Sequence, residues 1–115
     1  VTHENTMTQE LIITDIEVGN GKTAVKGALI TTRYSGRLTD GTQFDASDAF
    51  QCVIGTGRVI KGWDQGIIGM NVGGKRQLSV PAHLAYGERQ MGDRIPANSA
   101  LFFDIELLEV LTRDD

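Results

Sequence analysis

Apolar and polar residues alternate along much of the chain, in runs of the length expected for β-strands. The clearest run covers residues 101–110, where positions 101, 103, 105 and 107 are all apolar. Asp104 and Glu106 stand between them, and successive side chains of a strand point to opposite faces. This segment is therefore expected to be a strand with one buried face and one face in solvent.

Four other segments also predict strands, each near a turn signal. Residues 11–18 break at Gly19-Asn20-Gly21, and residues 28–37 are rich in β-branched and aromatic side chains. An Asp-Gly pair at 40–41 predicts a tight hairpin turn into residues 42–45. The fourth segment, residues 77–80, stops at a proline, which cannot donate to a strand ladder.

Between positions 59 and 70 the spacing of the apolar residues changes. Ile60, Trp63 and Ile67 stand at i, i+3 and i+7, which places them on one stripe of a helix. Glycines at 66 and 69 weaken this helix, and the pair at 73 and 74 is expected to end it. An antiparallel sheet must bury its apolar face, and this helix is the available cover. The predicted class is α+β: a curved antiparallel sheet of about five strands wrapped around one short α-helix.

The composition is that of one ordinary globular domain. The 115 residues are 40% hydrophobic and 23% charged, with a net charge of -4. A negative chain whose longest basic cluster is Lys75-Arg76 does not suit nucleic acid. No apolar run approaches the ~20 residues that span a bilayer. We expect a loose leader at residues 1–10, one domain at residues 11–112, and a monomer that binds neither nucleic acid nor membrane.

The sequence leaves the compartment open. The chain begins at Val1, and Met7 is one candidate initiator, which would make residues 1–6 a remnant. An excised signal peptide is equally compatible with this beginning. We expect the cytoplasm, with a periplasmic or secretory location as the alternative.

Residue types that often carry chemistry are few and scattered. Cys52 is the only cysteine, so no internal disulfide forms, and no histidine or basic residue adjoins it to activate the thiol. His3 and His83 stand far apart without a metal-ligand spacing, which predicts surface histidines. We therefore expect no metal, no cofactor, and an inert, partly buried thiol at Cys52.

A series of short motifs runs through residues 18–110. They are Tyr34-Ser35-Gly36 with Leu38 and Asp40-Gly41, Phe44-Asp45-Ala46-Ser47, Ile54-Gly55, Val59-Ile60-Lys61-Gly62-Trp63-Asp64, Gly69-Met70-Asn71-Val72-Gly73-Gly74-Lys75-Arg76, Ala85-Tyr86-Gly87, Ile95-Pro96, and residues 101–107. Each motif is weak by itself, but their order, spacing and number together make the chain resemble the FKBP family of peptidyl-prolyl cis-trans isomerases.

The resemblance implies an apolar pocket, although each aromatic alone would more simply be a core residue. Trp63 would form the floor, and the N–H of Ile60 and the hydroxyl of Tyr86 would bond carbonyl groups of a bound peptide. Asp45 would lie at the rim, paired with the Tyr34 hydroxyl. The catalytic residues implied are Tyr34, Asp45, Ile60, Trp63 and Tyr86, and the ligand-binding residues are Phe44, Phe50, Val59, Ile95 and Phe103.

Two features depart from the pattern of that family. The segment at 46–50 is shorter than in many members and lacks the basic residue often found there near the acid. Cys52 stands where many members have a second phenylalanine beside the pocket wall. Both departures bear on the pocket edge and on the affinity for inhibitors. The loop between Tyr86 and Ile95 is compact, without room for the chaperone domain that some bacterial relatives insert there.

A protein of this kind is expected to accelerate rotation about Xaa-Pro peptide bonds and so to assist protein folding. Its partners would be proline-containing peptides, folding polypeptides and macrolide inhibitors of the rapamycin type. The alternative is a binding module that uses the same pocket to hold a proline-containing peptide or a protein partner without catalysis.

Overall fold

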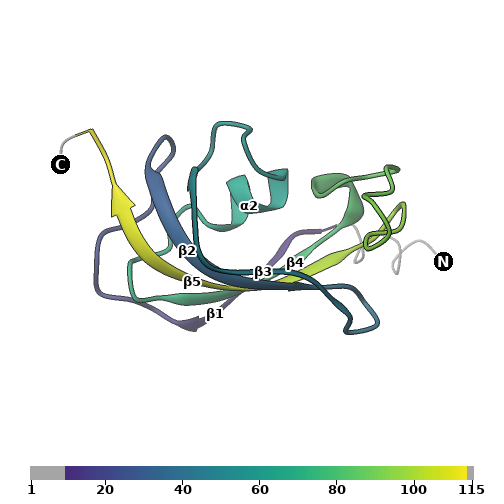
Figure 1. Ribbon diagram of the computed structural model, residues 1–115. Coiled ribbons are helices and arrows are strands. Elements are labelled where there is room, and N and C mark those ends of the chain that lie inside the picture. The colour runs from purple at the N-terminus through teal and green to yellow at the C-terminus, as the bar shows by residue number, and fades with distance from the viewer. Residues whose placement is uncertain (1–9, 114–115) are drawn as a thin grey trace.

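In the computed structural model, which describes residues 10–113, five strands form one antiparallel sheet that curves around a short helix (Figure 1). This confirms the predicted α+β class. The sheet has the order β1-β4-β5-β2-β3. Residues 1–9 of the predicted leader lie outside the described residues. The elements are β1 (Ile12–Glu17), β2 (Leu29–Arg37), β3 (Gln43–Val53), α2 (Lys61–Gly66), β4 (Lys75–Val80), the 3-10 turn η1 (Ala82–Leu84) and β5 (Leu101–Leu111).

The central strand β5 shows the alternation that its sequence predicts. Leu101 and Leu107 are fully buried, and Phe103 and Ile105 are at most 5% exposed. These side chains face the concave side of the sheet, where the rest of the hydrophobic core is gathered. Burying one such side chain stabilises a fold by about 1.5–3 kcal/mol. The core therefore fixes which face of the sheet the helix covers.

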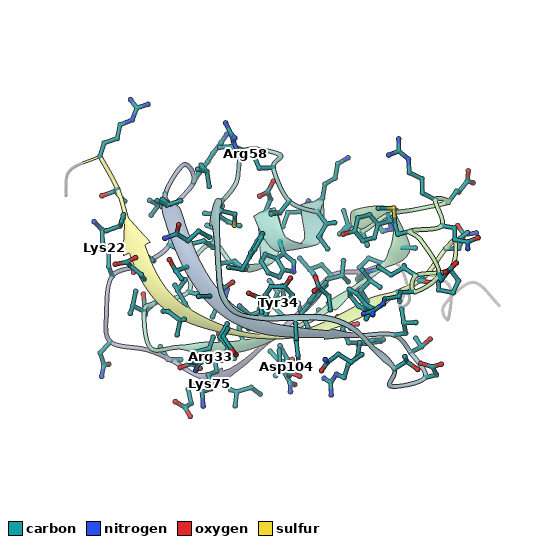
Figure 2. All side chains as sticks on the ribbon, in the orientation of Figure 1. Lys22, Arg33, Tyr34, Arg58, Lys75 and Asp104 are labelled. Atoms are coloured by element: carbon teal, nitrogen blue, oxygen red, sulfur yellow. The ribbon has the colours of Figure 1, made fainter. Side chains whose placement is uncertain are left out.

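The opposite, convex face of the sheet is charged. Arg33 donates to Glu106 at 2.9 Å, and Arg37 lies 2.7 Å from Asp104. Figure 2 shows Arg33, Lys75 and Asp104 together on this face, across the sheet from α2. Exposed pairs of this kind contribute about 0–1 kcal/mol each, so they keep this face in solvent more than they hold the fold together.

Two glycines let α2 lie directly on β4. A Cβ atom at Gly62 would lie 2.4 Å from a methyl of Val80, and one at Gly66 would lie 2.8 Å from the side chain of Leu78. Glycine costs a helix about 1 kcal/mol relative to alanine, and here close packing offsets that cost. Trp63, between the two glycines, is consequently pressed against the core at 4% exposure.

The helix ends earlier than predicted. It stops at Gly66, not at the glycine pair of positions 73 and 74, so that prediction was wrong. The N–H of Met70 already bonds the carbonyl of Ile67 in a turn, and Gly69 has a φ of 96°. That left-handed conformation takes the chain out of the helix direction and toward β4.

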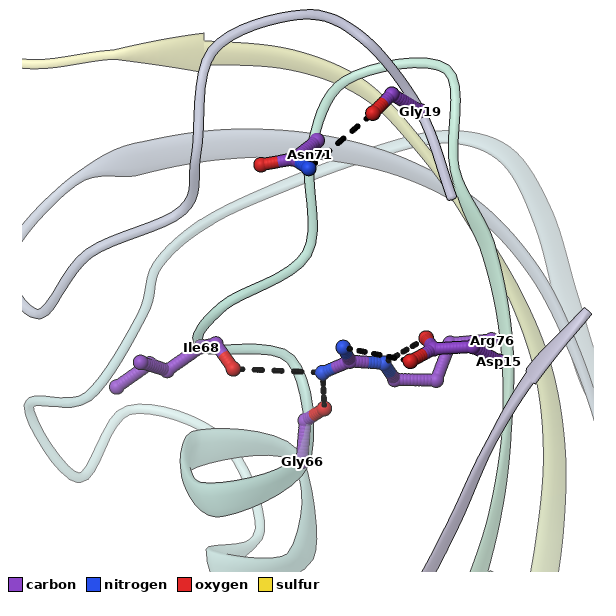
Figure 3. Close-up of polar contacts among 6 residues, drawn as sticks. All are labelled: Asp15, Gly19, Gly66, Ile68, Asn71 and Arg76. Atoms are coloured by element: carbon purple, nitrogen blue, oxygen red, sulfur yellow. Dashed lines mark hydrogen bonds and ion pairs between the residues drawn. The ribbon is translucent and has the colours of Figure 1, made fainter. Parts of the chain in front are cut away.

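Arg76 ties the end of the helix to the edge strand β1 (Figure 3). Its guanidinium donates to the carbonyls of Gly66 at 2.8 Å and Ile68 at 3.3 Å, and to the Asp15 carboxylate at 2.7 Å. The last carbonyls of a helix have no partner within the helix, and a cation there also suits the helix dipole. One side chain thus fixes the seat of α2 against the sheet.

Strand β3 extends well beyond residues 42–45, where the sequence predicts it to end. Thr32 pairs with Phe50 whereas Tyr34 pairs with Ser47, so two residues of β3 stand against one of β2 between these pairs. This is a β-bulge, which inserts one residue and reverses the alternation of side chains. The short segment at 46–50 is therefore a continuous, bulged strand.

Within residues 10–113, no helix has the length and apolar character needed to cross a membrane.

Candidate active site

An apolar pocket of about 250 Å³ opens between the start of α2, the concave side of the sheet and the loop after η1. Nine of its ten lining residues were predicted for the site from the sequence, and the tenth, Arg58, was not. The nine predicted lining residues are Tyr34, Phe44, Asp45, Phe50, Val59, Ile60, Trp63, Tyr86 and Phe103.

Trp63 forms the floor of this pocket and is held by three other rings. Tyr34 meets it edge to face at 4.9 Å between ring centroids, Phe103 at 5.5 Å and Phe50 at 5.8 Å. Edge-to-face pairs contribute about 0.5–1.5 kcal/mol each beyond their buried area. The indole is therefore a rigid surface that borders the pocket while its other face belongs to the core.

Asp45 lies at the exposed rim of the pocket, with both carboxylate oxygens engaged. The Tyr34 hydroxyl donates to one oxygen at 2.6 Å, and the N–H of Ala46 donates to the other at 2.9 Å. Burial, then the bond to Asp45 and the charge of Asp45, raise the pKa of Tyr34 well above its ordinary value. The Tyr34 hydroxyl is therefore a committed donor that stays protonated at neutral pH.

Two hydrogen-bond donors border the pocket without a partner among residues 10–113. The carbonyl of Ile60 accepts bonds from Trp63 and Asp64, but its own N–H makes none in this part of the chain. The Tyr86 hydroxyl likewise makes no hydrogen bond with the described residues, and burial followed by the charge of Asp45 raises the pKa of Tyr86. The pocket therefore offers two free donors for carbonyl oxygens, beside apolar walls.

The segment that carries Arg58, Val59 and Ile60 is fixed by the helix behind it. The Asp64 carboxylate accepts the N–H of Gly55 at 2.7 Å and that of Gly57 at 2.9 Å. A carboxylate bonded to two backbone donors is a strong local restraint. Arg58 was missed from the sequence because an isolated arginine in a turn carries no pattern. Its position directly before Val59-Ile60 is the one signal that points to the pocket.

Ile95 is the predicted site residue that does not line the pocket. Its N–H and carbonyl pair with Met91, and its side chain is 7% exposed within the hydrophobic core. The neighbouring Arg94 does not line the pocket either, but its guanidinium donates to the carbonyl of Phe44, a lining residue, at 3.1 Å. This bond ties the loop that follows Tyr86 to the pocket wall.

The other reactive side chains lie outside the pocket lining. Cys52 is partly buried, as predicted, and burial followed by the charge of Asp64 raises the pKa of its thiol to about 11. The thiol is therefore protonated at neutral pH and a poor nucleophile. His83 is exposed on η1, as predicted, while His3 lies outside the described residues. Across residues 10–113, no three His, Cys, Asp or Glu side chains gather as a metal site.

The chain is similar to known proteins over most of its length. A family model described as FKBP-type peptidyl-prolyl cis-trans isomerase matches residues 20–108. FK506-binding protein 4 of Gibberella zeae is 50% identical over 105 residues, which cover 89% of this chain and 21% of that protein. The FK506-binding protein of Neisseria meningitidis serogroup A is 48% identical over 104 residues, covering 87% of this chain and 95% of that one.

A solved structure is similar over nearly the same stretch. The crystal structure of AtFKBP13 superimposes with a TM-score of 0.82 at 44% identity, covering 88% of this chain and 93% of that one. The chain thus spans about a fifth of the length of the Gibberella zeae protein but nearly all of the Neisseria meningitidis protein.

Proposed function

The chain belongs to the FKBP-type peptidyl-prolyl cis-trans isomerase family, and we propose that its pocket accelerates cis-trans rotation about Xaa-Pro peptide bonds. One observation carries this proposal. An aromatic pocket floored by Trp63 is open to solvent and bordered by two free donors, the N–H of Ile60 and the hydroxyl of Tyr86.

The reaction to be accelerated is a rotation, not a bond exchange. Rotation about a peptide bond has a barrier of ~18–20 kcal/mol because it breaks amide resonance. Prolyl bonds populate both isomers and interconvert in tens to hundreds of seconds. A catalyst must therefore bind the twisted amide more tightly than either planar form.

The pocket has the properties that favour a twisted amide. Water stabilises the charge separation of the planar amide, and aromatic walls that replace water around a bound prolyl bond would remove that stabilisation. The prolyl ring would rest on Trp63, between walls formed by Tyr34, Phe44 and Phe103. The two free donors would hold the flanking carbonyl groups, so that the bond between them is twisted. Each ~1.4 kcal/mol gained in this way accelerates the rotation tenfold.

Asp45 acts in this proposal as an electrostatic and positioning residue. Its bond to the Tyr34 hydroxyl fixes a ring that meets Trp63, so it holds one wall of the pocket in place. Its charge also raises the pKa of Tyr86, which keeps that hydroxyl a donor. No nucleophile and no proton shuttle is needed.

We also propose that the pocket binds macrolide inhibitors and that the protein assists folding. The relatives are named FK506-binding proteins, and the same pocket would bind macrolides of the rapamycin type. Turnover of prolyl bonds in unfolded chains would assist folding. Cys52 does not line the pocket, so its difference from the family pattern would affect inhibitor affinity only through packing.

A protease-coupled assay on a Phe-Pro peptide tests the activity. We expect isomerisation faster than the uncatalysed rate, a marked loss for Asp45→Val, and lower activity or altered ligand binding for Trp63→Ala. A rate equal to background, with the fold intact by circular dichroism, would favour the binding module instead. Trp63 is the only tryptophan, so its fluorescence reports macrolide binding, and a flat titration would refute that part.

A further inference from the structure

Arg58 is a cation in the pocket lining that has no protein partner among residues 10–113. Its side chain is exposed, and it takes part in none of the ion pairs or hydrogen bonds of this part of the chain. Arg33, Arg37 and Arg76 by contrast each pair with a carboxylate. Figure 2 places Arg58 on the helix side of the sheet, away from the charged convex face.

The backbone of Arg58 is held in a defined place beside the donor at Ile60. Asp64 bonds the N–H of Gly57 immediately before Arg58, and Ile60 is extended, with φ -58° and ψ 150°. Arg58 stands two residues before Ile60, in the bend that leads into α2, and both residues line the same pocket. A peptide carbonyl held at the Ile60 N–H would therefore bring a neighbouring side chain of the substrate close to the guanidinium.

The two charged residues that line the pocket differ in the hydrogen bonds that they already make. Asp45 is the one acidic lining residue, and both of its carboxylate oxygens already accept hydrogen bonds. Arg58 has five N–H donors and no carboxylate partner among the described residues. Arg58 is thus the one cation in the pocket lining, and its guanidinium is open to an anion of a bound peptide, although the whole chain carries a net charge of -4.

We propose that Arg58 forms a subsite for the carboxylate of an aspartate or glutamate that flanks the proline in the substrate. This rests on the proposed prolyl-bond binding of the same pocket. An exposed ion pair of this kind is expected to favour a glutamate peptide over its glutamine counterpart about two- to fivefold. The preference should shrink as salt screens the charges.

The experiment compares matched peptides on the same protein. Peptides with blocked ends carry Glu or Gln either before the proline or after it, and exchange NMR gives kcat/KM while Trp63 fluorescence gives Kd. The wild type should prefer Glu over Gln on at least one flank by about two- to fivefold at low salt. Arg58→Gln should abolish the preference, and Arg58→Lys should retain most of it.

Lys75→Gln is the matched control, because it removes the same charge from the convex face (Figure 2). It should keep the Glu preference of the wild type. Since each ratio is taken within one variant, a general loss of activity cancels. Turnover of the Gln peptides without any Glu preference, or a preference that survives Arg58→Gln, would overturn the subsite and leave the isomerase proposal standing. If no peptide is isomerised, the isomerase proposal fails, and the Kd ratios still decide the subsite.

Discussion

The Tyr34 hydroxyl and the Asp45 carboxylate are joined by a hydrogen bond of 2.6 Å across the paired strands β2 and β3. Tyr34 also meets Trp63 edge to face. The rim and the floor of the pocket are therefore connected through one tyrosine ring, and a change at Asp45 is expected to be felt at the indole.

Replacing Asp45 by asparagine should lower the pKa of Tyr34. The carboxylate contributes a hydrogen bond and a charge, both of which favour the protonated phenol, and Asp45→Asn removes the charge. Burial is the larger cause and remains, so the pKa should stay above that of a free tyrosine. Titration of tyrosine absorbance measures the change. Asp48→Asn on the same strand, whose side chain is fully exposed, should leave the curve of the wild type unaltered.

Removing the Asp64 carboxylate should loosen the segment before the helix. Asp64→Ala leaves the N–H groups of Gly55 and Gly57 without their acceptor. We expect a loss of about 1–3 kcal/mol in the free energy of unfolding, measured with urea. Amide exchange at both glycines should accelerate. Gln65→Ala, at an exposed position of the same helix, is the control, and equal exchange in both variants would contradict the assigned role.

A lysine at position 76 should not stabilise the fold as the Arg76 guanidinium does. Arg76→Lys keeps the charge but cannot reach the carbonyls of Gly66 and Ile68 and the carboxylate of Asp15 together (Figure 3). Thermal or urea unfolding should show a loss of about 1–3 kcal/mol. An unchanged stability would mean that the packing of α2 on β4 alone seats the helix.

Cys52 should react as a buried thiol. Its pKa is about 11, so at pH values between the ordinary thiol pKa and about 11 the folded protein keeps the thiol protonated, whereas an unfolded chain has lost the proton. The rate of alkylation by iodoacetamide should therefore keep rising with pH to about 11, whereas the denatured protein should level off near the ordinary value of ~8.5. A plateau near the ordinary value in the folded protein would show that burial does not protect the thiol.

The sequence predicts those elements whose pattern comes from one unbroken period. In β5, residues 101–107 alternate without interruption, and their buried face is as expected. Trp63 in α2 and Ile67, the residue that directly follows the helix, are both buried, as the predicted stripe requires. The sequence predicts too short a strand at β3, because the bulge reverses the alternation of side chains between Ser47 and Phe50. No single period therefore covers the whole strand.

The sequence predicts most of the residues that line the pocket, but not the hydrogen bonds at its edge. Nine lining residues follow from the resemblance, and six of them are aromatic. The burial of Ile95 depends on a bridge to Met91, and the bond of Arg94 to the Phe44 carbonyl joins residues 50 positions apart. Contacts made by one side chain on a distant backbone group leave no periodic trace in a sequence.

The dependence of kcat/KM on pH, measured for the wild type on an uncharged Leu-Pro peptide, tests most directly whether the pocket twists its substrate without proton transfer. The pKa values of Tyr34 and Tyr86 are raised, and neither Cys52 nor a histidine lines the pocket. We expect a value constant within about twofold from about pH 6 to 9, with no solvent deuterium isotope effect. A bell-shaped profile, or a rate that falls severalfold in deuterium oxide, would contradict it.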